Sequence, residues 1–273
     1  MITLLIDGDP IAYKAVHSAN SRAEDPGPLA GQMIDKLVRE LNATRAIVAV
    51  SDRSRRYWRH DLDPAYKAGR PAPPDNIETA RAGLAGRRGV VKELAMLEAD
   101  DIIGILATSP DVRGRKIIVA TDEHMMTIPG EHHRPGKCRP GQTVQVSAAE
   151  AECRHLQQTM ASTLDRVGLP TAEKLITLYD YISSPIGAWR KVVREFRARG
   201  HSDWDALKAA RIARVCRVNE FNLETLSVVP WEPPKAPYSV SYEAPPAAAA
   251  PTASADRVHA SLYDDDGPKH PWT

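Results

Sequence analysis

Short apolar runs alternate with longer amphipathic stretches through the first half of the chain. The apolar runs are residues 2–6, 46–50, 89–94 and 116–120, and helical periodicity covers residues 29–41. Apolar runs of roughly four to eight residues are typical of buried strands, and their alternation with helices is typical of a parallel sheet. The pattern therefore predicts an α/β fold with a mostly parallel central sheet flanked by helices.

The second half of the chain has a different pattern. Helical periodicity covers residues 147–160, 173–182, 186–199 and 203–218. From residue 232 the composition changes to Pro, Ala and Ser, which bury too little apolar surface to offset the entropy lost on ordering. We therefore expect three parts, an α/β domain at residues 1–146, a helical part at 147–231 and a disordered tail at 232–273.

The composition excludes several protein classes. The chain has 273 residues and three cysteines without a CxxC pair, so it indicates neither a disulfide framework nor a zinc site. Three unpaired cysteines fit a reducing compartment. No apolar run approaches the ~20 residues that span a bilayer, and no signal peptide pattern precedes the first strand. These features predict a soluble cytoplasmic protein with no membrane partner.

Acidic residues follow the expected strands where each strand ends. Asp7, Asp52 and Asp122 occupy such positions, and a cluster of Glu98, Asp100 and Asp101 begins the apolar helix that follows the third run. In open α/β sheets the ligand crevice lies beyond the carboxyl ends of the strands. Carboxylates gathered there repel one another unless a cation lies among them, and a hard ion such as Mg²⁺ prefers their oxygens.

Each of these acids alone has a simpler interpretation. Aspartate is common in turns and at helix starts, where the helix dipole favours negative charge. Asp9 is followed by Pro10, so we expect Asp9 to cap the next helix. Four such placements in one half of the chain favour a common site over chance.

Basic and aromatic residues are concentrated between Asp52 and the third apolar run. The net charge of +1 therefore does not exclude a polyanionic partner. We interpret Arg81, Arg87 and Arg88 as a solvated helix face. Residues 59–70 combine Arg and Lys with Tyr, which suits phosphate contact and base stacking on a single strand.

Residues 58–70 read Trp-Arg-His-Asp-Leu-Asp-Pro-Ala-Tyr-Lys-Ala-Gly-Arg and resemble the basic segment of the 5′ nucleases, the family of flap endonucleases and phage 5′→3′ exonucleases. The resemblance continues through residues 98–101 and 118–129. Residues 211–222 look like the C-terminal helix of the short podophage 5′→3′ exonucleases. In total the resemblance covers residues 1–231.

The resemblance implies a resolvase-like, PIN-like domain and a metal-dependent 5′→3′ exonuclease or flap endonuclease. The implied substrate is DNA or an RNA:DNA hybrid, and the implied setting is phage DNA replication or recombination in the host cytoplasm. The helical part at residues 147–231 would be a divergent helix-three-turn-helix DNA-binding element.

The resemblance also implies a role for each matching residue. The ligands of Mg²⁺ or Mn²⁺ would be Asp7, Asp52, Glu98, Asp100, Asp101, Asp122 and Asp165. The catalytic residues would be Asp7, Asp100, Lys67 and Arg70, and the DNA contacts Arg59, Tyr66, Lys67, Arg70 and Lys174. Two ions about 3.5–4 Å apart can activate water and neutralise a leaving oxygen, and nearby cations stabilise the transition state.

The second metal site departs from the family pattern. His124 stands where the family has an Asp, Asp165 lacks an acidic partner, and residues 171–174 replace phosphate-binding glycines with Thr-Ala-Glu-Lys. Fewer carboxylates attract a hard cation less strongly. We therefore expect a complete first metal site and a weak or absent second one. His124 either faces solvent or binds a softer ion such as Mn²⁺.

Two other functions stay open at this point. Because the second metal site lacks acids of the family pattern, one alternative is a DNA-binding accessory protein that no longer cleaves DNA. The other is a ribonuclease, which the general fold also suits.

Two segments complete the expectations from the sequence. We expect residues 130–141 to form a surface loop, in which His132, His133 and Cys138 lack the spacing of metal ligands. Residues 262–266 are acidic with a Tyr and are a candidate contact for a single-strand-binding protein.

Overall fold

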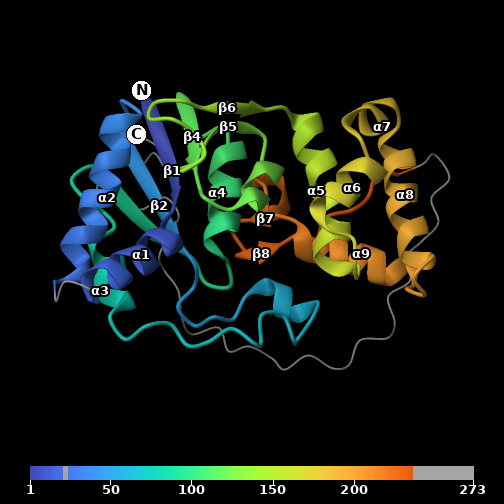
Figure 1. Cartoon of the computed structure of the whole chain (residues 1–273), viewed down its shortest axis with the longest axis horizontal. Coiled ribbons are helices and arrows are strands. Elements are labelled where there is room, and N and C mark those ends of the chain that lie inside the picture. The colour runs from blue at the N-terminus through green and yellow to red at the C-terminus, as the bar shows by residue number, and fades with distance from the viewer. Residues whose placement is uncertain (21–23, 236–273) are drawn as a thin grey trace. The chain divides into compact units, whose positions relative to one another are not determined.

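The computed structural model describes residues 1–20 and 24–235, which divide into two compact units (Figure 1). The first unit comprises Met1–Ser147 and Val215–Val229, and the second comprises Ala148–Arg214 and residues 230–235. The expected helical part at 147–231 is therefore not one unit, because the chain returns to the first unit after Arg214. The expected tail lies outside the described residues except for 232–235.

A six-stranded sheet forms the centre of the first unit, with the strand order β3-β2-β1-β4-β5-β6. The strands are β1 (Ile2–Asp7), β2 (Arg45–Val50), β3 (Gly89–Glu93), β4 (Arg115–Val119), β5 (Gly130–His133) and β6 (Val144–Val146). All neighbouring pairs are parallel except β5 and β6, which are antiparallel. This topology confirms the prediction of a mostly parallel sheet.

Helices cover both faces of the sheet, as Figure 1 shows. Leu5 and Ile118 face one side and pack with α4 (Ala99–Thr108). Leu4 and Val48 face the other side, because successive side chains of a strand point in opposite directions. On that side lie α1 (Gly8–Asn20), α2 (Pro26–Glu40) and α3 (Ile77–Gly83). The result is a three-layer α/β/α unit, which confirms the predicted fold class.

Residues 130–133 differ from expectation, because they form strand β5 and not part of a surface loop. His132 is buried and its Nε2 lies 2.8 Å from the carbonyl oxygen of Ile128. The Nδ1 of His133 lies 2.8 Å from the carbonyl oxygen of Gln142. Hydrogen bonds to backbone thus accommodate two polar side chains that the apolar pattern assigned to a loop.

The second unit is helical, as expected. Its helices are α5 (Ala148–Thr163), α6 (Leu169–Leu175), α7 (Leu178–Ser183), α8 (Pro185–Arg197) and α9 (Asp203–Ala213). The expected helix at 173–182 is interrupted, because the Thr177 side chain accepts from the Asp180 N–H and starts α7 there. The helix expected to reach residue 218 ends at Ala213, where the backbone becomes extended.

The five-helix unit has its own apolar core, formed by residues such as Leu156, Trp189, Phe196 and Leu207. Within the described residues of both units, every helix is too short or too polar to cross a membrane.

Candidate active site

The carboxyl ends of β1 and β4 bring two of the expected acids together. These strands are parallel neighbours, with Ile6 paired to Val119, so Asp7 at the end of β1 lies close to the Asp122 that follows β4. Strand order reverses here, which is where open α/β sheets form a crevice. A cavity of about 510 Å³ opens at this point, and its polar lining includes Asp7, Asp9, Glu98, Asp100, Asp122, His124, Lys67 and Arg70.

The start of helix α4 supplies two further acids of the cavity. Glu98 precedes the helix in an extended conformation, and Asp100 lies in its first turn. The hydroxyl oxygen of Ser51, just after β2, accepts a hydrogen bond of 3.0 Å from the N–H of Ala99. This bond ties the helix start to the edge of the sheet and holds its acids over the crevice.

The ionised form of two carboxyl groups that line the cavity is disfavoured. Burial, followed by the charges of Asp9 and Asp122, raises the pKa of Asp7 to about 7. Burial and the neighbouring carboxylates of Asp101 and Glu98 raise the pKa of Asp100 well above its usual range. Both shifts mean that a cation placed among these side chains would be strongly favoured.

Asp101 has a different environment from Asp100, although the two are adjacent. Arg59 binds it with two hydrogen bonds, Nη1 to Oδ2 at 2.6 Å and Nη2 to Oδ1 at 2.9 Å. The Trp58 indole and the Cys216 N–H donate further bonds of 3.0 and 3.1 Å. Burial alone would raise the pKa of Asp101, but Arg59 lowers it. Donors thus occupy both oxygens, so the geometry favours a positioning role over metal ligation.

Arg59 was expected to contact DNA, and the structure corrects this expectation. The residue is only 1% exposed and binds Asp101 and Glu98 in the interior. Its ring neighbours are Trp58 and Tyr66, whose centroids lie 4.6 and 5.9 Å from the guanidinium carbon. A guanidinium enclosed in this way holds Asp101 and Glu98 in place and is not available to a phosphate.

Asp52 holds two loops together. Its Oδ1 accepts from the N–H of Ser54 at 2.9 Å, and its Oδ2 accepts from the N–H of Met96 at 2.8 Å. Asp52 does not line the cavity, and both its oxygens are used between the loop after β2 and the loop after β3. We therefore assign Asp52 a supporting role, in which it fixes the loops beside the metal ligands.

Cationic and phenolic side chains contact the acids of the cavity. They come from the segment that begins with the short helix η1 (Trp58–Asp61). The Tyr66 hydroxyl donates to Glu98 Oε2 at 2.9 Å, and the Lys67 ammonium pairs with Glu98 Oε1. Lys67 has a φ of 56°, an unusual value for a side chain other than glycine. Such strain is common where a side chain must be aimed at a site.

The sequence interpretation missed several residues of the site. Asp9 does not cap α1, because its Oδ2 accepts from the Ser51 N–H at 3.2 Å and its Oδ1 from Arg81 at 3.1 Å. Arg81 was assigned to a solvated face, yet its side chain is only 14% exposed. Tyr13 lies one helical turn after Asp9 and also lines the cavity. The four-residue spacing of Asp9 and Tyr13 was a usable signal.

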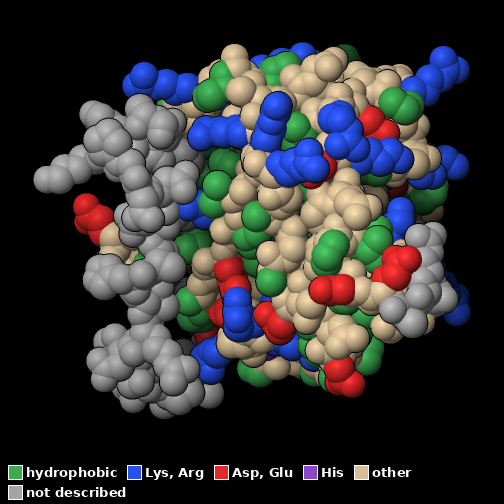
Figure 2. Space-filling view, turned by 90° about the vertical axis from the view of Figure 1, so that its left-hand side faces the viewer, with side chains coloured by type: hydrophobic (Ala, Val, Ile, Leu, Met, Phe, Trp, Pro, Cys, Tyr) green, Lys and Arg blue, Asp and Glu red, His purple; other side chains and the backbone are tan. Residues whose placement is uncertain are grey.

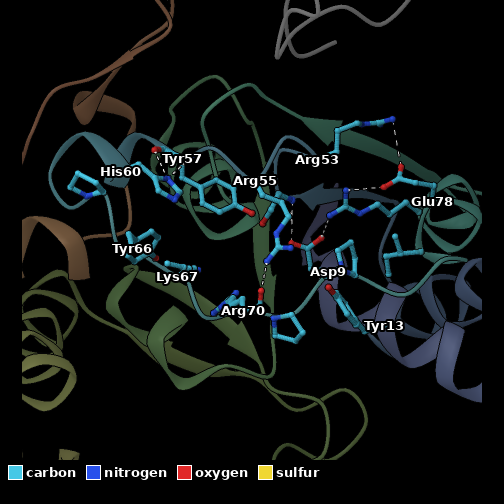
Figure 3. A pocket seen from close by; sticks show the side chains of 18 residues that line it. Asp9, Tyr13, Arg53, Arg55, Tyr57, His60, Tyr66, Lys67, Arg70 and Glu78 are labelled. Carbon is cyan, nitrogen blue, oxygen red and sulfur yellow. Dashed lines mark hydrogen bonds and ion pairs between the residues drawn. The ribbon is translucent and has the colours of Figure 1, made fainter. Parts of the chain in front are cut away.

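A second cavity of about 640 Å³ adjoins the first and shares Asp9, Tyr13, Ser51, Lys67 and Arg70 with it. Figure 3 shows its lining of arginines and aromatic rings. The lining includes Arg53, Arg55, Arg70, Arg81, Tyr57, His60 and Tyr66. Basic groups beside aromatic faces suit a nucleic acid strand.

Basic charge also gathers at the amino ends of the strands, away from the carboxylates. Arg39, Arg87 and Arg88 line a cavity of about 420 Å³ at the end of α2. Figure 2, which views the side of the molecule formed by α1 to α3, shows a band of Lys and Arg side chains across its upper part. Arg87, which lines this cavity, has 89% of its side chain exposed.

Two of the expected site residues, Asp165 and Lys174, belong to the second unit, where both are exposed. Their roles in metal and DNA binding stay predictions.

The chain also matches a known family model. The model described as the 5′-3′ exonuclease N-terminal resolvase-like domain matches residues 2–154, more than half of the chain. The chain belongs to the 5′ nuclease family. The resemblance expected from residues 58–70 and 98–101 is thereby confirmed.

Curated relatives of this 5′ nuclease include phage and bacterial enzymes. The exonuclease of Escherichia phage T7 is 24% identical over 213 residues, which cover 64% of this chain and 70% of the relative. The flap endonuclease Xni of Cronobacter sakazakii is 35% identical over 96 residues, 33% of this chain and 38% of the relative. DNA polymerase I of Thermus filiformis is 30% identical over 129 residues, which cover 44% of this chain and 15% of the polymerase.

A solved structure described as T5 5′-exonuclease with divalent metal ions (zinc) bound has the same fold. Its TM-score to this nuclease is 0.58 with 10% sequence identity, covering 78% of this chain and 89% of that chain. At this identity the similarity concerns the fold alone, and it confirms the resolvase-like arrangement of sheet and helices.

Proposed function

We propose that this 5′ nuclease is a divalent-metal-dependent 5′→3′ exonuclease or flap-type nuclease that hydrolyses phosphodiester bonds in DNA. RNA:DNA hybrids are the second substrate that we propose for the same site. The observation that carries the proposal is the convergence of Asp7, Glu98, Asp100 and Asp122 on one cavity that Lys67 and Arg70 also line.

The residues of the cavity fit a hard or borderline cation. The carboxylates of Glu98 and Asp100 both line it, and each offers an oxygen within 4.8 Å of the other. The raised pKa values of Asp7 and Asp100 express the same demand for positive charge. Asp7, Glu98, Asp100 and Asp122 would hold Mg²⁺ or Mn²⁺, with Asp52 and Asp101 supporting them. A bound ion supplies an activated water and neutralises charge on the leaving oxygen.

The cationic side chains of the cavity would bind the substrate. Lys67 and Arg70 would contact the scissile phosphate, where the transition state gains negative charge. Lys67 is already directed at the carboxylates, because it pairs with Glu98. Tyr66 would orient Glu98 through its hydroxyl group.

The adjoining cavity would receive the strand beyond the scissile phosphate. Its arginines suit phosphates, and its rings suit the faces of unpaired bases. In the second unit, Lys174 would contact the duplex, and Asp165 would contribute to a second ion site. These assignments extend the proposal from one phosphate to a DNA substrate with a 5′ end, nick or flap.

A gel assay with labelled substrates tests the proposal. The substrates are a 5′ flap, a nicked duplex, single-stranded DNA, an RNA:DNA hybrid and RNA, each with Mg²⁺, Mn²⁺ or a chelator. We expect metal-dependent products from the DNA substrates and none with the chelator. Products from RNA alone would instead select the ribonuclease.

One observation favours a second candidate, a DNA-binding accessory protein. His124 replaces an acid of the family pattern, and Asp165 has lost its acidic neighbour in the sequence. Binding of the flap substrate without products at any metal concentration would select this function.

The setting of the activity is part of the proposal. The phage relatives favour DNA replication or recombination in the host cytoplasm. A single-strand-binding protein is the proposed partner of residues 262–266, which lie outside the described part of the chain.

A further inference from the structure

We propose that His124 is a metal ligand and that, with Asp100, it forms a mixed nitrogen and oxygen site that favours a transition ion such as Mn²⁺ over Mg²⁺. The inference rests on the proposed metal-dependent nuclease function and specifies its ion. Its basis is the position of one imidazole ring in a cavity otherwise lined with carboxylates.

The distance between the His124 ring and Asp100 is that expected of two ligands of one metal ion. Its side chain is 20% exposed, lines the cavity, and places Nδ1 3.9 Å from Asp100 Oδ2. This separation is too long for a hydrogen bond. With metal–ligand bonds of about 2.1 Å, two ligands of one octahedral ion lie about 3.0 to 4.2 Å apart. The two atoms are therefore spaced like two ligands of one ion.

The backbone around His124 is held on both sides. Its N–H donates to Asp122 Oδ1 at 2.9 Å, and its carbonyl oxygen accepts from the Thr127 hydroxyl at 2.8 Å. These bonds close the short helix η2 (Glu123–Thr127), whose Met125 is buried in the core. The direction of the ring is thus set by a fixed turn at the end of β4.

The chemistry of the donors determines which ion they prefer. Mg²⁺ binds oxygen and keeps much of its water, whereas imidazole nitrogen suits first-row transition ions. Asp7 and Glu98, which line the same cavity, offer only oxygen. The cavity therefore combines carboxylates suited to either ion with one nitrogen donor that discriminates between them.

A competing role for His124 is that of a counter-charge. A protonated imidazole 3.9 Å from Asp100 would neutralise part of the acidic cluster without binding metal. A metal ligand and a counter-charge differ in one measurable respect, because only a ligand couples its nitrogen nucleus to a paramagnetic ion.

Pulsed electron paramagnetic resonance on the full chain without a histidine tag makes this measurement, with Mn²⁺ added below one equivalent. We expect a directly coordinated nitrogen signal in the wild-type protein and its loss in His124→Ala. The matched control is His17→Ala, since His17 is exposed on α1 and outside the cavity lining. The control should keep the signal.

A calorimetric titration measures the selectivity. Each variant is titrated with Mn²⁺ and separately with Mg²⁺, and a thermal melt confirms that it is folded. His124→Asp should lower the ratio of Mn²⁺ to Mg²⁺ affinity by about tenfold or more, because an oxygen replaces the nitrogen ligand. His17→Asp should leave the ratio unchanged.

The outcomes separate this inference from the proposed function. Absence of a nitrogen signal in the wild type, its persistence in His124→Ala, or an unchanged affinity ratio in His124→Asp would each overturn the role of His124. Any of these results can occur in a protein that cuts DNA, so the nuclease function would stand. A nitrogen signal in a protein that cuts none of the substrates would support the ligand and overturn the nuclease.

Discussion

The cavity face and the core behind it use the same residue type in opposite ways at the start of α4. On the cavity face, Asp100 has a raised pKa and neighbours of its own sign. In the core, Asp101 has a lowered pKa and a buried guanidinium bound to both its oxygens. In the core the counter-charge is Arg59, whereas on the cavity face Lys67 pairs with Glu98 and Asp100 keeps a raised pKa among carboxylates.

This difference explains why a dense run of acids in a sequence is not a list of metal ligands. Some carboxylates bind the ion, and others fix the elements that carry the ligands. Asp101 joins α4, the segment of Arg59 and the returning chain at Cys216 through hydrogen bonds. Removing an acid from the cavity should therefore affect chemistry, whereas removing charge from the core should affect folding.

The largest effect is expected on the cavity face. Asp100→Asn should reduce cleavage of a 5′-flap substrate by about a thousandfold or more, since a bound ion is the source of the activated water. Binding of the flap, measured by fluorescence anisotropy, should change little. Asp122→Asn should behave in the same way. Asp111→Asn, an exposed position beyond the other end of α4, is the control. Undiminished cleavage by both cavity variants would refute the proposed mechanism.

The next effect is expected in the core. Arg59→Met should lower the free energy of unfolding by about 3–5 kcal/mol, because it leaves Asp101 and Glu98 buried without their cation. Urea denaturation followed by circular dichroism measures the change. Arg88→Met on the exposed surface should change it by less than about 1 kcal/mol. Equal stability of the two variants would remove the distinction between core and cavity.

A smaller effect is expected at the cationic side chains of the cavity. Lys67→Ala should lower kcat by about ten- to a hundredfold and change KM only a few-fold, because its charge matters most in the transition state. Steady-state kinetics on the flap substrate separates the two parameters. Lys137→Ala, an exposed position outside both cavities of the active site, is the control. A change confined to KM would make Lys67 an anchor only.

The smallest effect is expected from pH. The pKa of Asp7 is about 7 in the metal-free fold, so a proton occupies this carboxyl at pH 6 and must leave before an ion binds. Metal affinity should therefore rise about tenfold between pH 6 and pH 8. Without metal, the folded state binds the extra proton between the ordinary pKa of 3.8 and 7, so its stability falls as pH rises through this window.

Melting temperatures with and without Mg²⁺ at pH 6 and pH 8 measure both effects. The increase caused by metal should be greater at pH 8. An equal increase at both values would contradict the assignment of Asp7 to the ion.

The fold was largely predictable from the apolar pattern. The strands at residues 2–6, 46–50 and 116–120 appear within one residue at each end, because short apolar runs that contain β-branched residues are typical of buried strands. Strand β5 was not predictable in this way. Its Gly-Glu-His-His sequence has no apolar run, and its pairing with β4 and β6 depends on tertiary hydrogen bonds.

The sequence predicted most of the acids that line the cavity, but it did not predict the contacts that decide the role of each acid. Strand ends and a helix start bring Asp7, Asp100 and Asp122 to one cavity, as the topology of a parallel sheet requires. Burial of the Arg59 side chain has no local signal, because it depends on acids 39 and 42 residues further along the chain. The contact between Asp9 and Arg81 spans 72 residues and is equally invisible in the sequence.

The return of the chain after Arg214 has a consequence for how the molecule is made and dissected. The Cys216 N–H donates to Asp101 and the Val218 N–H donates to the Thr108 hydroxyl group. Both ends of α4 are therefore bonded to residues that are translated more than a hundred positions later. A ribosome must release the entire helical insertion before this helix can be fully anchored. A fragment that stops at Ser147 should consequently be less stable than an excision variant that joins Ser147 to Val215 through a short linker.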